Sequence, residues 1–305
     1  MNVILVANDN KKNGEFLQWK PEVLTTVSNL LFLKQMYPEY NYVLYVDSTT
    51  EKYYGDLGIT QLFDEINTSV LNRNYSIDTK AFWAYSKIFA LRATPAPCVI
   101  FDLDFRVFDD IRGLGYFNHD VGAFCLENIK GKYYYSKPEE CLQGINVPRD
   151  FDWDEFSVNV SSLYFKDSEF KNIYCDWVIN YMYDWSFVHK NDTMDYGDNI
   201  ILFSEQYMLN QLIKKHNKTT ALLVDDTQEE PLPKNYISLG LNKTNNFNYV
   251  YHFGRTKTLL VRDSKEYNIE IDTIVNYANL KIKDQKGLEI LNNINTNKQY
   301  ERYFR

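Results

Sequence analysis

The stretch CVIFDLDF (98–105) decides the fold class. Its first four residues form an apolar run, which is typical of a strand buried on both faces of a parallel sheet. Two carboxylates follow, and side chains two positions apart in an extended chain point to the same side. Hard oxygen ligands of this kind suit Mg²⁺ or Mn²⁺. The stretch therefore predicts a buried strand whose polar end, Asp102 and Asp104, holds a divalent metal ion.

Strand and helix patterns alternate on both sides of this stretch, which predicts an α/β fold. Upstream, the patterns predict strands at 3–7, 42–46 and 62–66, a helix from Pro21 to just before Pro38, a short helix or turn at 51–57 and a largely buried helix at 79–92. Downstream, they predict strands at 122–126, 158–165, 221–226 and 249–253, a helix around 170–181, a helix from Ser204 and an amphipathic helix at 266–282.

Composition excludes several classes of protein. The net charge of −8 argues against a protein whose affinity comes from the phosphates of long nucleic acids. The four cysteines have no CxxC spacing and lie in apolar surroundings, so we expect reduced core thiols and a cytoplasmic location, in a bacterium or in the host of a virus. No window is apolar enough to span a membrane.

The ends of the chain carry separate expectations. Residues 1–10 have no basic segment and no small-residue cleavage site, so they predict a first strand and no signal peptide. Residues 1–262 are expected to form the catalytic domain, and 263–305 a helical and polar C-terminal appendage. The aromatic and basic residues of the tail would also suit weak contact with an anionic membrane surface.

A second chemical motif is YHFGRTK (251–257), which also follows a predicted strand. A neutral imidazole is a good third ligand for Mn²⁺, so His252 is the candidate partner of the two aspartates. Gly254 permits close approach of the backbone to a phosphate, and Lys257 can neutralise charge on a leaving diphosphate. A histidine at a strand end can instead be a hydrogen-bonded structural residue.

Five segments resemble, in the same order, the motifs of GT-A fold glycosyltransferases, most closely the family-8 retaining galactosyl- and glucosyltransferases. The segments are VILVANDN (3–10), the stretch from Lys80 through CVIFDLDFRVFDDI (98–111), FSVNVSSLYF (156–165), SEQYMLNQL (204–212) and YHFGRTK (251–257). The resemblance implies a Rossmann-like mixed sheet flanked by helices, with the appendage as its C-terminal addition. Glu205 stands where the family has Asp, and Lys80 where it usually has Arg.

The resemblance also implies a role for each motif residue. The donor-binding residues would be Asn8, Asp9, Asn10, Lys80, Asp102, Leu103, Asn159 and Gly254. The metal ligands would be Asp102, Asp104 and His252, and the catalytic residues Gln206, Glu205 and Lys257. Glu205 has a second interpretation, because Ser204-Glu205 is also good chemistry for the capped start of a helix.

The implied activity is a Mn²⁺- or Mg²⁺-dependent hexosyl- or pentosyltransferase. It would move a sugar from a nucleotide-sugar donor, with UDP favoured, to a hydroxyl acceptor with retention of configuration. A surface glycan or a protein hydroxyl is the expected acceptor. Hydroxymethylated phage DNA is the disfavoured one, because the chain is acidic.

Two alternatives remain open. VIFDLD (99–104) is also how haloacid-dehalogenase-like phosphatases present their nucleophile and acid. In that family the second Asp is normally followed by Gly-Thr and lies near the first strand, whereas here Phe105-Arg106 follow and about a hundred residues precede. The other alternative is a non-catalytic sugar-binding protein on the same fold, whose Tyr and Trp side chains would stack on sugars.

Overall fold

The computed structural model describes residues 1–8, 19–107, 110–129, 141–142, 144–145, 156–190, 199–225, 232–242, 250–252 and 265–304. The chain forms two compact units. Unit 1 consists of Met1–Asn72, Phe101–Asp110 and Phe247–Arg305, and unit 2 of Arg73–Ile100 and Ile111–Asn246. Each unit combines strands with helices, and the strands form parallel and antiparallel pairs. The predicted α/β class with a mixed sheet is confirmed.

Unit 1 is built on parallel strands in the order β3-β2-β1. These are β1 (Asn2–Ala7), β2 (Asn41–Val46) and β3 (Glu65–Asn67). The first two correspond to the predicted apolar runs, and their register runs from Asn2↔Asn41 to Ala7↔Val46. Helix α1 (Lys20–Met36) connects them and has Pro21 in its first turn, as predicted. A proline is tolerated there because the first-turn N–H groups have no partner within the helix.

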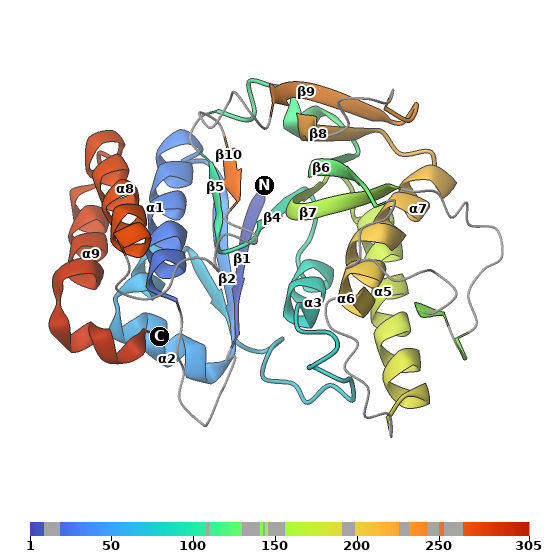
Figure 1. Cartoon of the computed structure of the whole chain (residues 1–305), viewed down its shortest axis with the longest axis horizontal. Coiled ribbons are helices and arrows are strands. Elements are labelled where there is room, and N and C mark those ends of the chain that lie inside the picture. Colours follow the sequence, from blue (N-terminus) through green and yellow to red (C-terminus); the bar gives the residue numbers. More distant parts are fainter. Residues whose placement is uncertain are drawn as a thin grey trace. The chain divides into compact units, whose positions relative to one another are not determined.

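The C-terminal helices are part of unit 1 and pack against α1. Helices α8 (Lys265–Lys281) and α9 (Gln285–Thr296) contact α1 and each other (Figure 1). The approach is close, because a Cβ atom at Gly287 would overlap Leu31 Cδ2. The sequence predicted α8 but not α9, whose start is capped by Asp284. The domain boundary at 262/263 stays a prediction.

Helix α2 (Ser48–Asp56) of unit 1 is capped by Asp47, whose side chain accepts a hydrogen bond from Thr50 N.

Unit 1 also contains a short antiparallel pair, β5 (Phe105–Val107) with β10 (Val250–His252). Strand β10 was predicted, whereas β5 was not. The three residues of β5 include an arginine and are too few to show a strand pattern in the sequence. Strand β5 therefore depends on its pairing with β10.

Unit 2 carries the strand order β4-β7-β6-β8-β9. Strand β6 pairs antiparallel with β7 and parallel with β8, and β8 pairs parallel with β9. The strands are β4 (Cys98–Phe101, whose last residue belongs to unit 1), β6 (Val121–Asn128), β7 (Phe156–Phe165), β8 (Thr220–Asp225) and β9 (Tyr236–Asn242). The helices α3 (Tyr85–Ala93), α5 (Ser168–Val188), α6 (Asn199–Leu202) and α7 (Met208–Lys215) accompany them, and α5 and α7 contact β7 (Figure 1).

Two helix starts differ from the predictions. The helix expected from residue 79 begins at Tyr85, because the Asp78 side chain accepts the backbone N–H groups of Lys80 and Ala81 and holds a turn instead. The capped start at Ser204 is wrong. Ser204 lies inside a continuous helical segment, in a π-helical turn (Phe203–Tyr207) between α6 and α7, and its hydroxyl donates to Ile201 O at 3.1 Å.

All four cysteines are free and buried, which confirms the predicted core thiols. Burial raises the pKa of the Cys98 thiol to about 11, so this group stays protonated at neutral pH. In the described part of the chain, no helix has the length and apolar character needed to cross a membrane.

Gly122 on β6 is expected to be a sensitive position of the unit 2 core. A Cβ atom there would lie 2.6 Å from the ring of Tyr116, which is fully buried and hydrogen-bonded to Ser162 Oγ at 2.8 Å. Gly122→Ala should therefore lower the free energy of unfolding by about 1–3 kcal/mol through overpacking. Gly55→Ala is the control, because nothing lies within 4 Å of its added methyl group. Urea unfolding of both variants checks this, and equal stabilities would contradict it.

The buried tyrosines should make the protein sensitive to alkali. Burial raises the pKa of Tyr116, Tyr174 and Tyr181 above the usual value of 10.0. The unfolded chain releases these protons first, so the contribution of these tyrosines to stability is constant below pH 10 and falls above it, by about 1.4 kcal/mol per pH unit for each tyrosine. Urea titrations between pH 9 and about 11 should show this slope. Tyr174→Phe should reduce the slope, and an unchanged slope in this variant would contradict the prediction.

Candidate functional site

The two predicted metal-binding aspartates lie in a tight turn between β4 and β5. The Phe105 N–H donates to Asp102 O at 3.0 Å, and the rings of Phe101 and Phe105 stack on either side of the turn with centroids 5.5 Å apart. Asp104 is buried and Asp102 is half-buried. The turn therefore carries two carboxylates on a backbone that is fixed by apolar neighbours.

The predicted third metal ligand, His252, is brought to this turn by strand pairing. In the antiparallel β5–β10 pair, His252 is opposite Phe105, the residue that follows Asp104. Opposed residues in such a pair have Cα atoms about 4.5–5.5 Å apart. All three residues belong to unit 1. Positions almost 150 residues apart in the sequence thus lie within one residue of each other in the strand register.

The chemistry of this group of residues fits a divalent cation. Carboxylate oxygens with an imidazole suit Mn²⁺, and carboxylates alone suit Mg²⁺. Among the side chains that the structure describes, no group of three or more His, Cys, Asp or Glu residues is placed to hold a metal ion. His252 is described by its backbone only. The assignment of Asp102, Asp104 and His252 as metal ligands stays a prediction.

Of the other predicted residues in unit 1, Asn8 follows the last residue of β1 and is half-buried. Leu103 lies between the two aspartates, and its carbonyl oxygen is 3.1 Å from Thr26 Oγ1 of α1. Asp9, Asn10, Gly254 and Lys257 lie outside the described residues.

In unit 2, the predicted donor-binding residue Asn159 lies on β7 within a hydrogen-bond network. Its Nδ2 donates to Glu127 Oε1 at 3.0 Å. Its Oδ1 accepts from Ser161 N at 3.1 Å and from Ser161 Oγ at 2.7 Å. Ser161 therefore fixes the orientation of the Asn159 amide.

Glu205 forms a buried ion pair that the sequence did not predict. Its Oε1 faces Lys87 Nζ of α3 at 3.0 Å, and both side chains are at most 10% exposed. Lys87 Nζ also donates to Val160 O of β7 at 2.7 Å. The hydroxyl of Tyr174 donates to Glu205 O at 2.9 Å. These contacts join α3, α5, β7 and the π-helical turn around one charged group.

The position of Glu205 rules out its interpretation as a helix-cap residue. It lies in the middle of the π-helical turn, together with the half-buried Gln206. Such turns are rare within helices and are frequent at functional sites. Burying a carboxylate and an ammonium group costs desolvation free energy, and the pairing of Glu205 with Lys87 offsets part of that cost.

The basic residue chosen from sequence, Lys80, is exposed in the turn before α3. The lysine that reaches Glu205 is Lys87, in the first turn of α3. Its sequence signal is a lysine within the apolar segment YSKIFAL (85–91). Lysine is almost never fully buried without a partner, so this position predicts a buried acidic group elsewhere in the chain.

Comparison with known proteins gives distant similarities. No family model and no curated protein matches the chain. Among solved structures, it is similar to galactosyltransferase LgtC in complex with donor and acceptor sugar analogs, with 14% identity, a TM-score of 0.36 and coverage of 67% of this chain and 70% of that one. The chain is also similar to PaToxG glycosyltransferase, with 10% identity, a TM-score of 0.34 and coverage of 70% of this chain and 69% of that one. A 4-diphosphocytidyl-2C-methyl-D-erythritol synthase from Anaerococcus prevotii is similar with 11% identity, a TM-score of 0.34 and coverage of 76% of this chain and 91% of that one.

Two of these three proteins are named as glycosyltransferases, the class that the motifs of the chain resemble. Membership of family 8 stays a prediction.

Proposed function

We propose that the protein is a divalent-metal-dependent glycosyltransferase that uses a nucleotide-sugar donor. One observation carries the proposal. The β5–β10 pair brings the backbone of His252 to the turn that holds Asp102 and Asp104, within a single unit. A phosphate-carrying metal ion needs such a set of ligands from separate segments, with open positions for the diphosphate.

The proposed chemistry is departure of a nucleoside diphosphate from an anomeric carbon. A bound Mn²⁺ would supply positive charge to the leaving diphosphate. Asp102, Asp104 and His252 would hold that ion, and Lys257 would add a further positive charge near the leaving oxygen. Asn8 and Asn10 would address the base or ribose.

The residues of unit 2 are assigned to the sugar. The Lys87 ion pair fixes the Glu205 side chain, which suits a carboxylate that accepts hydrogen bonds from sugar hydroxyls. Gln206 would face the reacting carbon, and a donor phosphate oxygen would take the acceptor proton, which is compatible with retention.

The donor class and the acceptor follow from the same proposal. A UDP-sugar is the favoured donor, with a hexose or pentose as the transferred group. A glycan or a protein hydroxyl is the favoured acceptor, and the cytoplasm the proposed location.

Thermal denaturation of the full chain with UDP-, GDP-, CMP- and dTDP-sugars, with and without Mn²⁺, tests this proposal. A ligand that binds only the native state raises the melting temperature, by an amount set by its concentration relative to its Kd. We expect a shift with a UDP-sugar that requires Mn²⁺. Hydrolysis of p-nitrophenyl phosphate with Mg²⁺, without any donor-dependent shift, would favour the phosphatase alternative. Binding of a free sugar alone would favour the non-catalytic one.

A further inference from the structure

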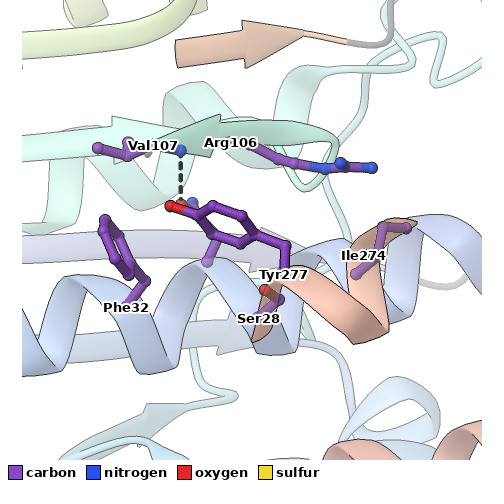
Figure 2. Close-up of a pocket in the computed structure, with 7 residues that line it drawn as sticks. Ser28, Phe32, Arg106, Val107, Ile274 and Tyr277 are labelled. Carbon is purple, nitrogen blue, oxygen red and sulfur yellow. Dashed lines mark hydrogen bonds between the residues drawn. The ribbon is translucent and has the colours of Figure 1, made fainter. Parts of the chain in front are cut away.

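A small cavity lies between α1, β5 and α8 in unit 1. It is lined by Ser28, Asn29, Phe32, Arg106, Val107, Ile274 and Tyr277 (Figure 2). Its volume of about 10 Å³ is room for about one water molecule. Arg106 forms an ion pair with Glu270 of α8, and the Val107 N–H donates to Asn29 Oδ1 at 2.9 Å, the bond drawn in Figure 2. An organic ligand therefore does not fit in this cavity.

The surface of unit 2 carries three exposed aromatic side chains, which we call the aromatic surface. Trp83 is 50% exposed, Phe187 is 74% exposed, and Tyr183 is exposed as well. In the described part of the chain, the other large apolar side chains that are exposed are aliphatic, namely Ile66, Val188, Ile237, Ile269 and Leu280. Contiguous exposed apolar groups often mark binding sites, whereas single ones need no explanation.

The three rings belong to two segments that pack together, the turn before α3 and the end of α5. The Asp78 N–H donates to Ser186 Oγ at 2.8 Å. The ring of Phe82 meets that of Trp185 edge to face, with centroids 5.4 Å apart. Trp83 directly follows Phe82 in this turn, and α3 contacts α5 along its length (Figure 1). Buried contacts therefore hold the exposed rings at one end of the α3–α5 pair.

Polar groups border the rings on α5. Tyr183 and Phe187 are four residues apart, so they lie on the same side of the helix. Asn180 and Asp184 are exposed and precede them by three residues each, which also makes them neighbours on the helix surface. Lys190 Nζ lies 5.5 Å from the centre of the Phe187 ring. An amide, a carboxylate and an ammonium group thus lie beside the two rings.

This combination of groups fits a carbohydrate. The C–H face of a sugar is apolar and packs on an aromatic ring, while its hydroxyl groups donate to carboxylate and amide oxygens at the edge of the ring. The apolar centre of a protein–protein interface is instead depleted of charged residues. An anionic membrane is disfavoured, because Asp184 lies beside the rings and the chain has a net charge of −8.

We propose that the aromatic surface of Trp83, Tyr183 and Phe187 binds a glycan by stacking. Asn180 and Asp184 would hydrogen-bond to its hydroxyl groups. The inference rests on the proposed function in one respect, because it names this glycan as the acceptor in preference to a protein hydroxyl. Binding at this surface requires neither the nucleotide-sugar donor nor a metal ion.

The test is the binding of three neutral hexasaccharides to the full chain without donor or metal. Maltohexaose, cellohexaose and chitohexaose are the probes, and isothermal titration calorimetry gives the Kd. We expect saturable binding of at least one of them. Phe187→Leu and Trp83→Leu keep an apolar side chain but remove the ring, and each should raise the Kd about tenfold, as is typical when an aromatic anchor is lost. Phe187→Tyr keeps the ring and should retain the affinity.

Leu280→Ala is the control, because this side chain on α8 is 78% exposed and belongs to unit 1. It should leave the Kd unchanged. All of these positions are exposed, so the variants should keep the stability of the parent within about 0.5 kcal/mol. Melting temperatures of the same samples check that each variant is folded.

Two results would overturn this inference, namely no saturable binding of any of the three probes, or equal Kd values for the parent and both leucine variants. Binding to vesicles of phosphatidylcholine and phosphatidylserine that is lost in Phe187→Ala but kept in Phe187→Leu would also overturn it, in favour of a lipid surface. The donor shift that requires Mn²⁺ is measured separately, so the proposed function would survive each of these results. Absence of that shift would overturn the proposed function, and with it the acceptor role of the glycan.

Discussion

Asp104→Asn is expected to lower Mn²⁺-dependent turnover of the nucleotide sugar by about 10²–10³-fold, the effect of removing one group that stabilises transition-state charge. The amide is nearly isosteric with the carboxylate but carries no negative charge, so it binds a divalent cation weakly. Asp104 is buried in the turn before β5, so the substitution also removes a charge that has a desolvation cost. The fold should therefore be retained. Release of the nucleoside diphosphate over a range of Mn²⁺ concentrations gives the measurement.

Asp272→Asn is the matched control for this experiment, because Asp272 is exposed on α8. It should leave turnover unchanged. Because Asp104 would act through the metal, high Mn²⁺ should restore part of the activity of Asp104→Asn. Turnover at the level of the parent in Asp104→Asn would remove the basis for the catalytic assignment.

Lys87→Met is expected to lower the free energy of unfolding by about 3–5 kcal/mol, because it leaves the Glu205 carboxylate buried without its partner. Both side chains of this pair are almost fully buried. Adding Glu205→Gln to the same chain should recover much of this loss, since it removes the remaining charge. The proposed function adds a second expectation, namely that the stable double variant has lost donor turnover. Urea unfolding and a turnover assay of the same samples provide both measurements.

The control for the stability effect is an ion pair of similar length at the surface. Lys52 Nζ lies 2.9 Å from Asp56 Oδ2, but the two side chains are 76% and 40% exposed. Lys52→Met should therefore change the stability by about 1 kcal/mol or less. Equal effects of Lys87→Met and Lys52→Met would contradict the interpretation of the Lys87 pair as a buried charge cluster.

The parts of the fold that could be predicted from sequence are those in which burial leaves a strong local pattern. Strands β1, β2 and β4 are apolar runs, and α1 has a proline at its start. The missed strand β5 contains Arg106, whose burial depends on Glu270, about 160 residues further on. The missed strand β9 has an exposed residue, Ile237, and a glycine, and it forms by pairing with β8. Such elements depend on long-range contacts that a local pattern does not contain.

The site shows the same division between local and long-range information. The two aspartates could be found because their spacing after an apolar strand has a direct chemical meaning. Glu205 had two interpretations, and only its position inside a continuous helical segment rules out the helix start. Lys87 itself was missed, because a lysine in an apolar helix does not reveal which acidic residue it meets. The ion pair of Arg106 with Glu270 depends on the packing of α8, which the sequence represents only as an amphipathic helix.

The most direct test of the proposed metal site is whether a histidine of this chain coordinates Mn²⁺. Electron spin echo envelope modulation of Mn²⁺ bound to the full protein with UDP detects nitrogen that is coupled to the ion. The account predicts coupling from one imidazole, its loss in His252→Gln and its retention in His216→Gln, where the histidine is exposed after α7. Bound Mn²⁺ without nitrogen coupling, or coupling that persists in His252→Gln, would contradict the central claim that His252 completes a metal site with Asp102 and Asp104.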